Sequence, residues 1–133
     1  MKAIRIHQYG DASTLKLEEV PPLSISEDQI LVRVRDAGVN PIDWKIRQGY
    51  LKNVMPAAFP MTVGQDFAGE VAQCGKGVNQ FKAGDRVCEL ASLVEQGAVK
   101  PRLGQTMNLS QAKEAQELSE TGRTHGKVIL KVA

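Results

Sequence analysis

The segment from Asn40 to Tyr50, NPIDWKIRQGY, holds the residues of this chain whose types and spacing best suit chemistry. The Asn40 amide can donate and accept hydrogen bonds, the Asp43 carboxylate can accept them, and the Tyr50 hydroxyl can relay a proton. Each residue also has a structural interpretation. Asn40 could bond into the turn at Pro41, Asp43 could begin a helix, and Tyr50 could be a half-exposed loop residue. The segment therefore predicts either a polar site or a capped helix.

Two polar residues outside this segment are further candidates. Gln65 follows Gly64 and could contact a ligand, or could only satisfy backbone groups. Arg123 could bind a phosphate through its forked donors, or could be a solvated cation at a helix end. The chain has two cysteines and two histidines, and none of them has the spacing of a zinc site. We therefore expect no metal.

The elements that must position these residues are short. Alternating apolar residues predict strands at 3–6, 15–20, 30–34 and 127–132, and glycine turns bound further strands at 69–75 and after 84–87. In the second strand, Leu15 and Leu17 should face inward. Helices are expected at 40–48, closed by Gly49, and from 109 to 121, with Ser110 as N-cap. Residues 92–96 resemble a helix end and 99–103 an extended segment. With no strand–helix–strand alternation, the pattern predicts an α+β, mostly antiparallel, barrel-like domain.

Composition excludes several classes of function. At 133 residues the chain fits one domain, and its net charge of +2 comes from interspersed acids and bases, so we expect no nucleic-acid partner. The longest nearly uncharged run, residues 54–65, is too short to cross a membrane. Two thiols without a secretion signal predict a reducing, cytoplasmic location.

The order of several motifs resembles the medium-chain dehydrogenase/reductase superfamily, specifically its zinc-free quinone oxidoreductase branch. The motifs are MKAIRIHQYGD, NPIDWKIRQG, VGQDFAGEVAQCGKGV, FKAGDRV and ELSETGRTHGKVILKV, and together they cover nearly the whole chain. Zinc-dependent members have a cysteine at the position of Asn40 and a histidine–glutamate pair at the positions of Gln65 and Asp66. An amide is a poor zinc ligand, so the resemblance implies a reductase that works without metal.

The resemblance implies a GroES-like, partly open, mostly antiparallel β-barrel with flanking helices, which would transfer hydride from NADPH to a quinone or activated alkene. Asn40 would contact the acceptor and the nicotinamide or ribose, and Asp43 would belong to the same cluster. Tyr50 would contact the quinone, although relatives place an aromatic residue one position later. Gln65 would contact the substrate or the nicotinamide amide, and Arg123 the cofactor phosphate.

A dinucleotide-binding domain should lie between residues 1–88 and 89–133, but the chain runs from one segment almost directly into the other, with the junction near 88–91. The glycines of GKGVNQ lack the third glycine of a dinucleotide fingerprint, because Gln80 stands there. We therefore expect no NADPH binding and no activity from this chain alone, and a homodimeric or tetrameric parent protein. Two alternatives remain: a free-standing GroES-like interaction module using the apolar loop 51–62, or an alkenal or enoyl reductase domain.

Overall fold

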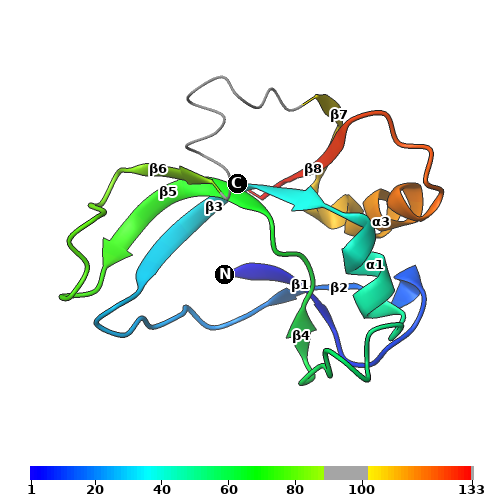
Figure 1. Ribbon diagram of the computed structural model, residues 1–133, viewed down its shortest axis with the longest axis horizontal. Coiled ribbons are helices and arrows are strands. Elements are labelled where there is room, and N and C mark those ends of the chain that lie inside the picture. The colour runs from blue at the N-terminus through cyan, green and yellow to red at the C-terminus, as the bar shows by residue number, and fades with distance from the viewer. Residues whose placement is uncertain (89–101, 133) are drawn as a thin grey trace.

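The computed structural model describes residues 1–88 and 102–132, and these residues form two sheets and two α-helices (Figure 1). The helices are α1 (Pro41–Arg47) and α3 (Ala112–Glu120), with short 3-10 turns at Ala12–Thr14 and Leu109–Gln111. The strands are β1 (Lys2–Ile6), β2 (Lys16–Glu19), β3 (Ile30–Val39), β4 (Met61–Thr62), β5 (Phe67–Cys74), β6 (Arg86–Cys88), β7 (Leu103–Asn108) and β8 (Lys127–Lys131). The sheet orders are β2-β1-β4 and β6-β5-β3-β8-β7. The pairings are antiparallel except β7–β8, and the sheets do not close, so the predicted partly open α+β fold is confirmed.

The five-stranded sheet has an apolar face and a polar face where β3 pairs with β8. Val39 is buried in the core, while its neighbour Gly38 lies against the Lys127 side chain and Asp36 pairs with Lys131. This alternation follows from the period of two in a strand, which sends successive side chains to opposite faces. The buried core on the apolar face consists of Ile4, Val39, Ala112, Ala115, Val128 and Leu130.

Helix α1 begins where β3 ends. Asn40 has an extended backbone (φ −119°, ψ 156°), and its N–H donates to Asp43 Oδ2 at 2.7 Å, which satisfies one of the donors left open at a helix start. Pro41 suits the first helical position because its φ is already near the helical value. Gly49 ends the helix at φ +80°, in a conformation that favours glycine. The helix predicted at 40–48 is therefore confirmed.

A fully buried arginine ties α1 to α3, which lie side by side in Figure 1. Arg47 donates from Nε to Gln116 Oε1 at 2.7 Å, from one terminal nitrogen to the Gly10 carbonyl at 2.7 Å, and from the other to Glu120 Oε1 at 2.5 Å. Gln48 Nε2 donates to the same Glu120 oxygen at 2.6 Å. The bonds to Gln116 and Glu120 join parts of the chain about 70 positions apart, so the C-terminal segment docks onto the N-terminal one.

Two details of the predicted elements are wrong. Leu17 is 44% exposed and lies in β2, an edge strand of the three-stranded sheet. Ser110 does not cap the second helix. The helical turn begins earlier, after Asn108, whose backbone N–H donates to Gln111 Oε1 at 3.0 Å. Gly122, by contrast, has φ +65° just beyond α3, as predicted.

The expectation that the chain has no strand–helix–strand unit is also wrong. β7, α3 and β8 form one, with β7 and β8 parallel. β7 was not predicted because it is an edge strand. Five of its six residues are exposed, so its sequence shows no alternation of apolar and polar residues. The helix end expected at 92–96 lies outside the described residues, as do most of the extended segment expected at 99–103 and most of the junction near 88–91.

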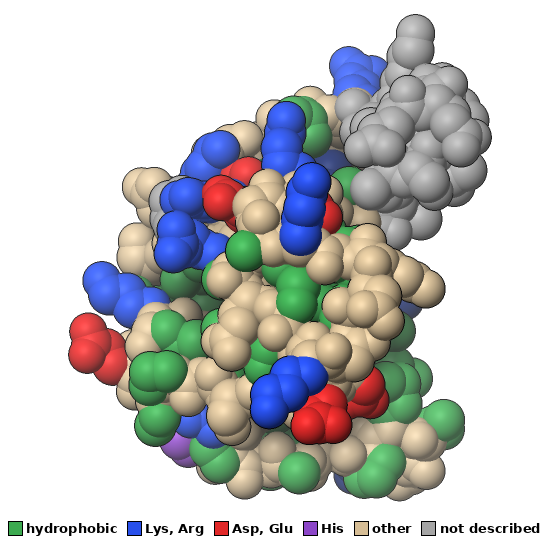
Figure 2. Space-filling model, turned by 90° about the vertical axis from the view of Figure 1, so that its left-hand side faces the viewer, with side chains coloured by type: hydrophobic (Ala, Val, Ile, Leu, Met, Phe, Trp, Pro, Cys, Tyr) green, Lys and Arg blue, Asp and Glu red, His purple; other side chains and the backbone are tan. Residues whose placement is uncertain are grey.

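The surface mixes charges of both signs. On the face shown in Figure 2, Lys and Arg side chains lie beside Asp and Glu side chains, with hydrophobic side chains between them. Among the described residues, no helix is long and apolar enough to cross a membrane. The apolar loop expected to be exposed is only partly so. Val54 is 81% exposed, whereas Phe59 packs edge-on against Tyr9 at 5.0 Å and Met61 pairs with Ile6 in the small sheet.

The buried arginine gives a direct test of this docking. Arg47→Met should lower the free energy of unfolding in urea by about 3 kcal/mol, because it leaves buried acceptors without donors. Arg35→Met is the matched control, since Arg35 is half exposed and lies 3.8 Å from Glu70. It should cost less than about 1 kcal/mol. Equal effects of the two substitutions would contradict a structural role for the buried guanidinium.

Candidate functional site

Three polar side chains from distant parts of the chain meet on the polar face of the larger sheet. Asn40 Nδ2 donates to Asp66 Oδ2 at 2.7 Å. The Lys127 ammonium donates to both Asn40 Oδ1 and Asp66 Oδ2. Asn40 follows β3, Asp66 precedes β5 and Lys127 begins β8, so three neighbouring strands bring them together. We call Asn40, Asp43, Asp66 and Lys127 the polar cluster.

A glycine makes room for the polar cluster. A Cβ atom on Gly38 would lie 2.6 Å from Lys127 Cε and 3.0 Å from Asp66 Cβ. The Gly38 N–H also donates to the Asp66 carbonyl at 3.0 Å. Glycine therefore allows the lysine stem to lie directly on the strand, and the backbone bond fixes where Asp66 leaves the sheet.

The buried member of the cluster is Asp43, which is only 2% exposed. Its Oδ2 accepts from the Asn40 backbone, while its Oδ1 has no partner among the described residues. Burial raises the pKa of Asp43 above its ordinary value. The Asn40 bond and Lys127 act against this increase, and the charge of Asp66 adds to it. Asp43 therefore holds its proton to a higher pH than an exposed aspartate does.

The other predicted site residues lie apart from the polar cluster. Tyr50 is 68% exposed and packs edge-on against Trp44, with ring centroids 5.9 Å apart. Gln65 is next to Asp66 in sequence, but its side chain is exposed. No hydrogen bond among the described residues links Tyr50 or Gln65 to Asn40. The structure thus brings Asn40 and Asp43 together and leaves Tyr50 and Gln65 at the surface.

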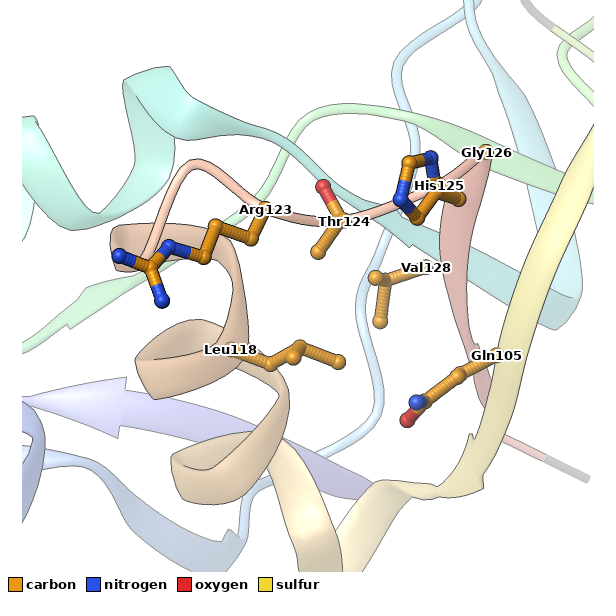
Figure 3. Close-up of a pocket in the computed structure, with 7 residues that line it drawn as sticks. All are labelled: Gln105, Leu118, Arg123, Thr124, His125, Gly126 and Val128. Atoms are coloured by element: carbon orange, nitrogen blue, oxygen red, sulfur yellow. The ribbon is translucent and has the colours of Figure 1, made fainter.

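Arg123 lines a small hollow of about 160 Å³ between α3, β7 and β8. Figure 3 shows Leu118 and Val128 pointing into this space, while the Arg123 guanidinium extends away from His125 along the end of α3. The hollow is too small for a dinucleotide, because cofactor and drug-sized sites measure about 300–1,000 Å³. Arg123 therefore lines a hollow that is formed by residues other than those of the polar cluster.

Sequence reasoning missed Lys127 as a site residue. It stood in a predicted strand, KVILKV, where its role is indistinguishable from that of an ordinary surface lysine. Asp66 was noticed only for its position beside Gln65. The usable signal was the pattern Gly38-Val39-Asn40, because a glycine inside a strand indicates close approach of another group. Among the described residues, no three His, Cys, Asp or Glu side chains lie close enough to share a metal ion.

Residues 26–122 match the alcohol dehydrogenase GroES-like domain. The chain belongs to this family. Over 100 residues it is 42% identical to a chloroplastic quinone-oxidoreductase homolog of Spinacia oleracea, a match covering 74% of this chain and 30% of the relative. It is 43% identical over 89 residues to a chloroplastic NADPH-dependent alkenal/one oxidoreductase of Arabidopsis thaliana, covering 65% and 22% of the two chains. These matches place it on the quinone oxidoreductase-like branch of the medium-chain dehydrogenase/reductase superfamily.

A solved structure supports the fold of this domain. Escherichia coli quinone oxidoreductase complexed with NADPH superposes with a TM-score of 0.60 at 21% identity, over 81% of this chain and 44% of that one. The chain thus spans less than half of this structure and about a third or less of the two relatives above.

The glycine turn after β5 does not fit a dinucleotide. The glycine turn after β5 leads to β6 rather than to a helix N-terminus. Its first glycine, Gly75, is instead used for packing: a Cβ there would lie 2.3 Å from the Ser26 carbonyl oxygen and 2.4 Å from that of Glu27. The turn therefore closes on the β2–β3 connection and offers no cradle for a pyrophosphate.

The buried carboxyl group predicts a pH dependence of stability. In the unfolded chain Asp43 should ionise near 3.8, whereas the native state holds the proton to higher pH. In this interval the native state binds more protons, so the free energy of unfolding falls as pH rises from about 3.8 through the native pKa. Asp43→Asn should remove this decrease, as measured by urea unfolding at a series of pH values.

Asp28 is the control for this experiment. Its hydrogen bond with Ser26 lowers the pKa of the Asp28 carboxyl. Asp28→Asn should therefore remove stability that is present above about pH 3.8 and lost at lower pH, which is the opposite sign. The same pH dependence in the wild type and in Asp43→Asn would contradict a raised pKa at Asp43.

Proposed function

We propose that this chain is the substrate-side domain of an NADPH-dependent, zinc-free quinone or enone reductase. The observation that carries the proposal is the polar cluster, in which the Asn40 amide is held by Asp66 and Lys127. This amide stands where zinc-dependent members of the superfamily have a cysteine. One N–H of Asn40 Nδ2 is used by Asp66, so the second can donate to the acceptor.

The arrangement suits a carbonyl compound better than a metal. An amide and an ammonium group offer hydrogen-bond donors, and neither is a ligand that zinc prefers. Donors held in place by the fold can bind a carbonyl oxygen without reorganising. Gln65 is the neighbour of Asp66 in sequence, and Tyr50 ends the segment that begins at Asn40. Both are exposed and remain proposed contacts to the substrate.

The acceptor class rests on the relatives. Both quinone and alkenal/one oxidoreductases are more than 40% identical to this chain over their matched segments. A quinone and an enone share a carbonyl conjugated to a carbon–carbon double bond, so the donors of the polar cluster could bind either compound. We propose the quinone as the acceptor, because similarity to quinone oxidoreductases covers more of the chain.

The whole protein is proposed to contain what this domain lacks. We infer that residues 1–88 and 89–133 are two family segments of one domain and that a dinucleotide-binding domain belongs to the parent. NADPH, with Arg123 near its phosphate, would bind only there, and the parent would be a homodimer or tetramer. A cytoplasmic location remains the prediction, with the plastid as the alternative because relatives are named chloroplastic.

Binding of a quinone to the isolated chain tests the proposed function. Duroquinone is suitable because its ring carbons are fully substituted, so the Cys74 and Cys88 thiols cannot add to it. In ¹H–¹⁵N spectra it should shift the amides of Asn40 and Lys127. Asn40→Ala should weaken binding roughly fivefold, the effect of one lost hydrogen bond. Asn53→Ala, at an exposed loop position, should leave binding unchanged.

The same sample tests activity. With NADPH and duroquinone, the absorbance of NADPH should stay constant, because nothing in the described residues positions the cofactor for hydride transfer. Turnover near the rate of full-length relatives would refute the proposal that cofactor binding needs the other domain of the parent protein. If duroquinone shifts only amide signals of residues away from the polar cluster, the proposed acceptor site is refuted.

A further inference from the structure

The Lys127 ammonium has one more N–H donor than its contacts with the described residues use. An ammonium group has three N–H donors, and two of them contact Asn40 Oδ1 and Asp66 Oδ2. The third has no acceptor among the described residues. The side chain is 30% exposed, so a small molecule can approach it. The two internal acceptors fix where this remaining donor points.

We propose that Lys127 contacts the carbonyl oxygen of the acceptor and stabilises negative charge that develops on it. This inference rests on the proposed function and adds a residue to it. In a site without metal, a fixed ammonium is the group best able to do this, because its charge strengthens the hydrogen bond. The Asn40 amide then binds the same oxygen or its neighbour as the second donor.

The carboxyl groups that face Lys127 do not cancel this role. Asp66 Oδ2 already accepts from both Asn40 and Lys127, so its charge is compensated within the polar cluster. Asp43 is buried, and its Oδ2 already accepts from the Asn40 backbone N–H at 2.7 Å. The other lysine of β8, Lys131, pairs with Asp36 at 3.0 Å and belongs to a separate ion pair on the same face.

A pair of small aromatic probes tests the role by binding alone. 4-Nitrophenolate presents an oxyanion like that of a reduced quinone, and 4-nitroanisole is its neutral methyl ether. The unmodified chain should bind the phenolate roughly fivefold more tightly, as measured from the amide shifts of Asn40 and Lys127. Lys127→Met should abolish this preference, Lys127→Arg should keep most of it, and Lys131→Met should leave it unchanged.

The outcomes separate this inference from the proposed function. If duroquinone binds at the polar cluster but the phenolate has no advantage, or if Lys127→Met keeps the advantage, the role of Lys127 is refuted and the proposed function stands. If neither duroquinone nor the phenolate binds there, both fail. Inorganic pyrophosphate is a third probe: shifts at Lys127 with pyrophosphate and none with the phenolate would assign the ammonium to a phosphate and overturn the proposal. Urea unfolding shows whether Lys127→Met is folded, and Lys127→Arg decides if it is not.

Discussion

The buried guanidinium of Arg47 is the interaction on which the rest of this domain depends. A charged group with no exposed surface is tolerated only when its donors are satisfied, and here the acceptors come from the Gly10 carbonyl and from Gln116 and Glu120 of α3. These partners lie in different parts of the chain. The two hydrogen bonds to Gln116 and Glu120 therefore fix how the C-terminal segment sits against α1, and the third holds the Gly10 turn. Hydrophobic packing alone is less directional and would allow more than one arrangement.

This docking places the polar cluster. α1 begins at Asn40 and ends at Arg47, so the helix held by the arginine also carries the amide. The C-terminal segment held by Gln116 and Glu120 continues into β8 and presents Lys127. Because β8 pairs with β3, its Val128 and Leu130 enter the core while Lys127 reaches the opposite face. The core and the polar cluster thus lie on opposite faces of the sheet, and the pairing of β3 with β8 positions both.

The chemistry of the polar cluster follows from the groups that meet there. An ammonium between an amide and a carboxylate is a positive charge supplied by the chain itself, and Gly38 leaves room for it. Among the described residues, one N–H of the amide and one of the ammonium have no acceptor, so this face has two hydrogen-bond donors close together. The described part of this fold holds no cradle for a nucleotide.

The sequence by itself determined the local elements and the family. The period of two in Ile30–Val34, the capped segment from Asn40 to Gly49 and the glycine after α3 rest on interactions between near neighbours in the chain, and these were predicted correctly. The tertiary structure alone decided three features: the parallel β7–β8 pair, the exposure of Leu17 and the contact of Lys127 with Asn40, 87 positions apart. An edge strand lacks an apolar pattern and a lysine in a strand has no local marker. Only the pairing of distant strands reveals which surface residues face one another.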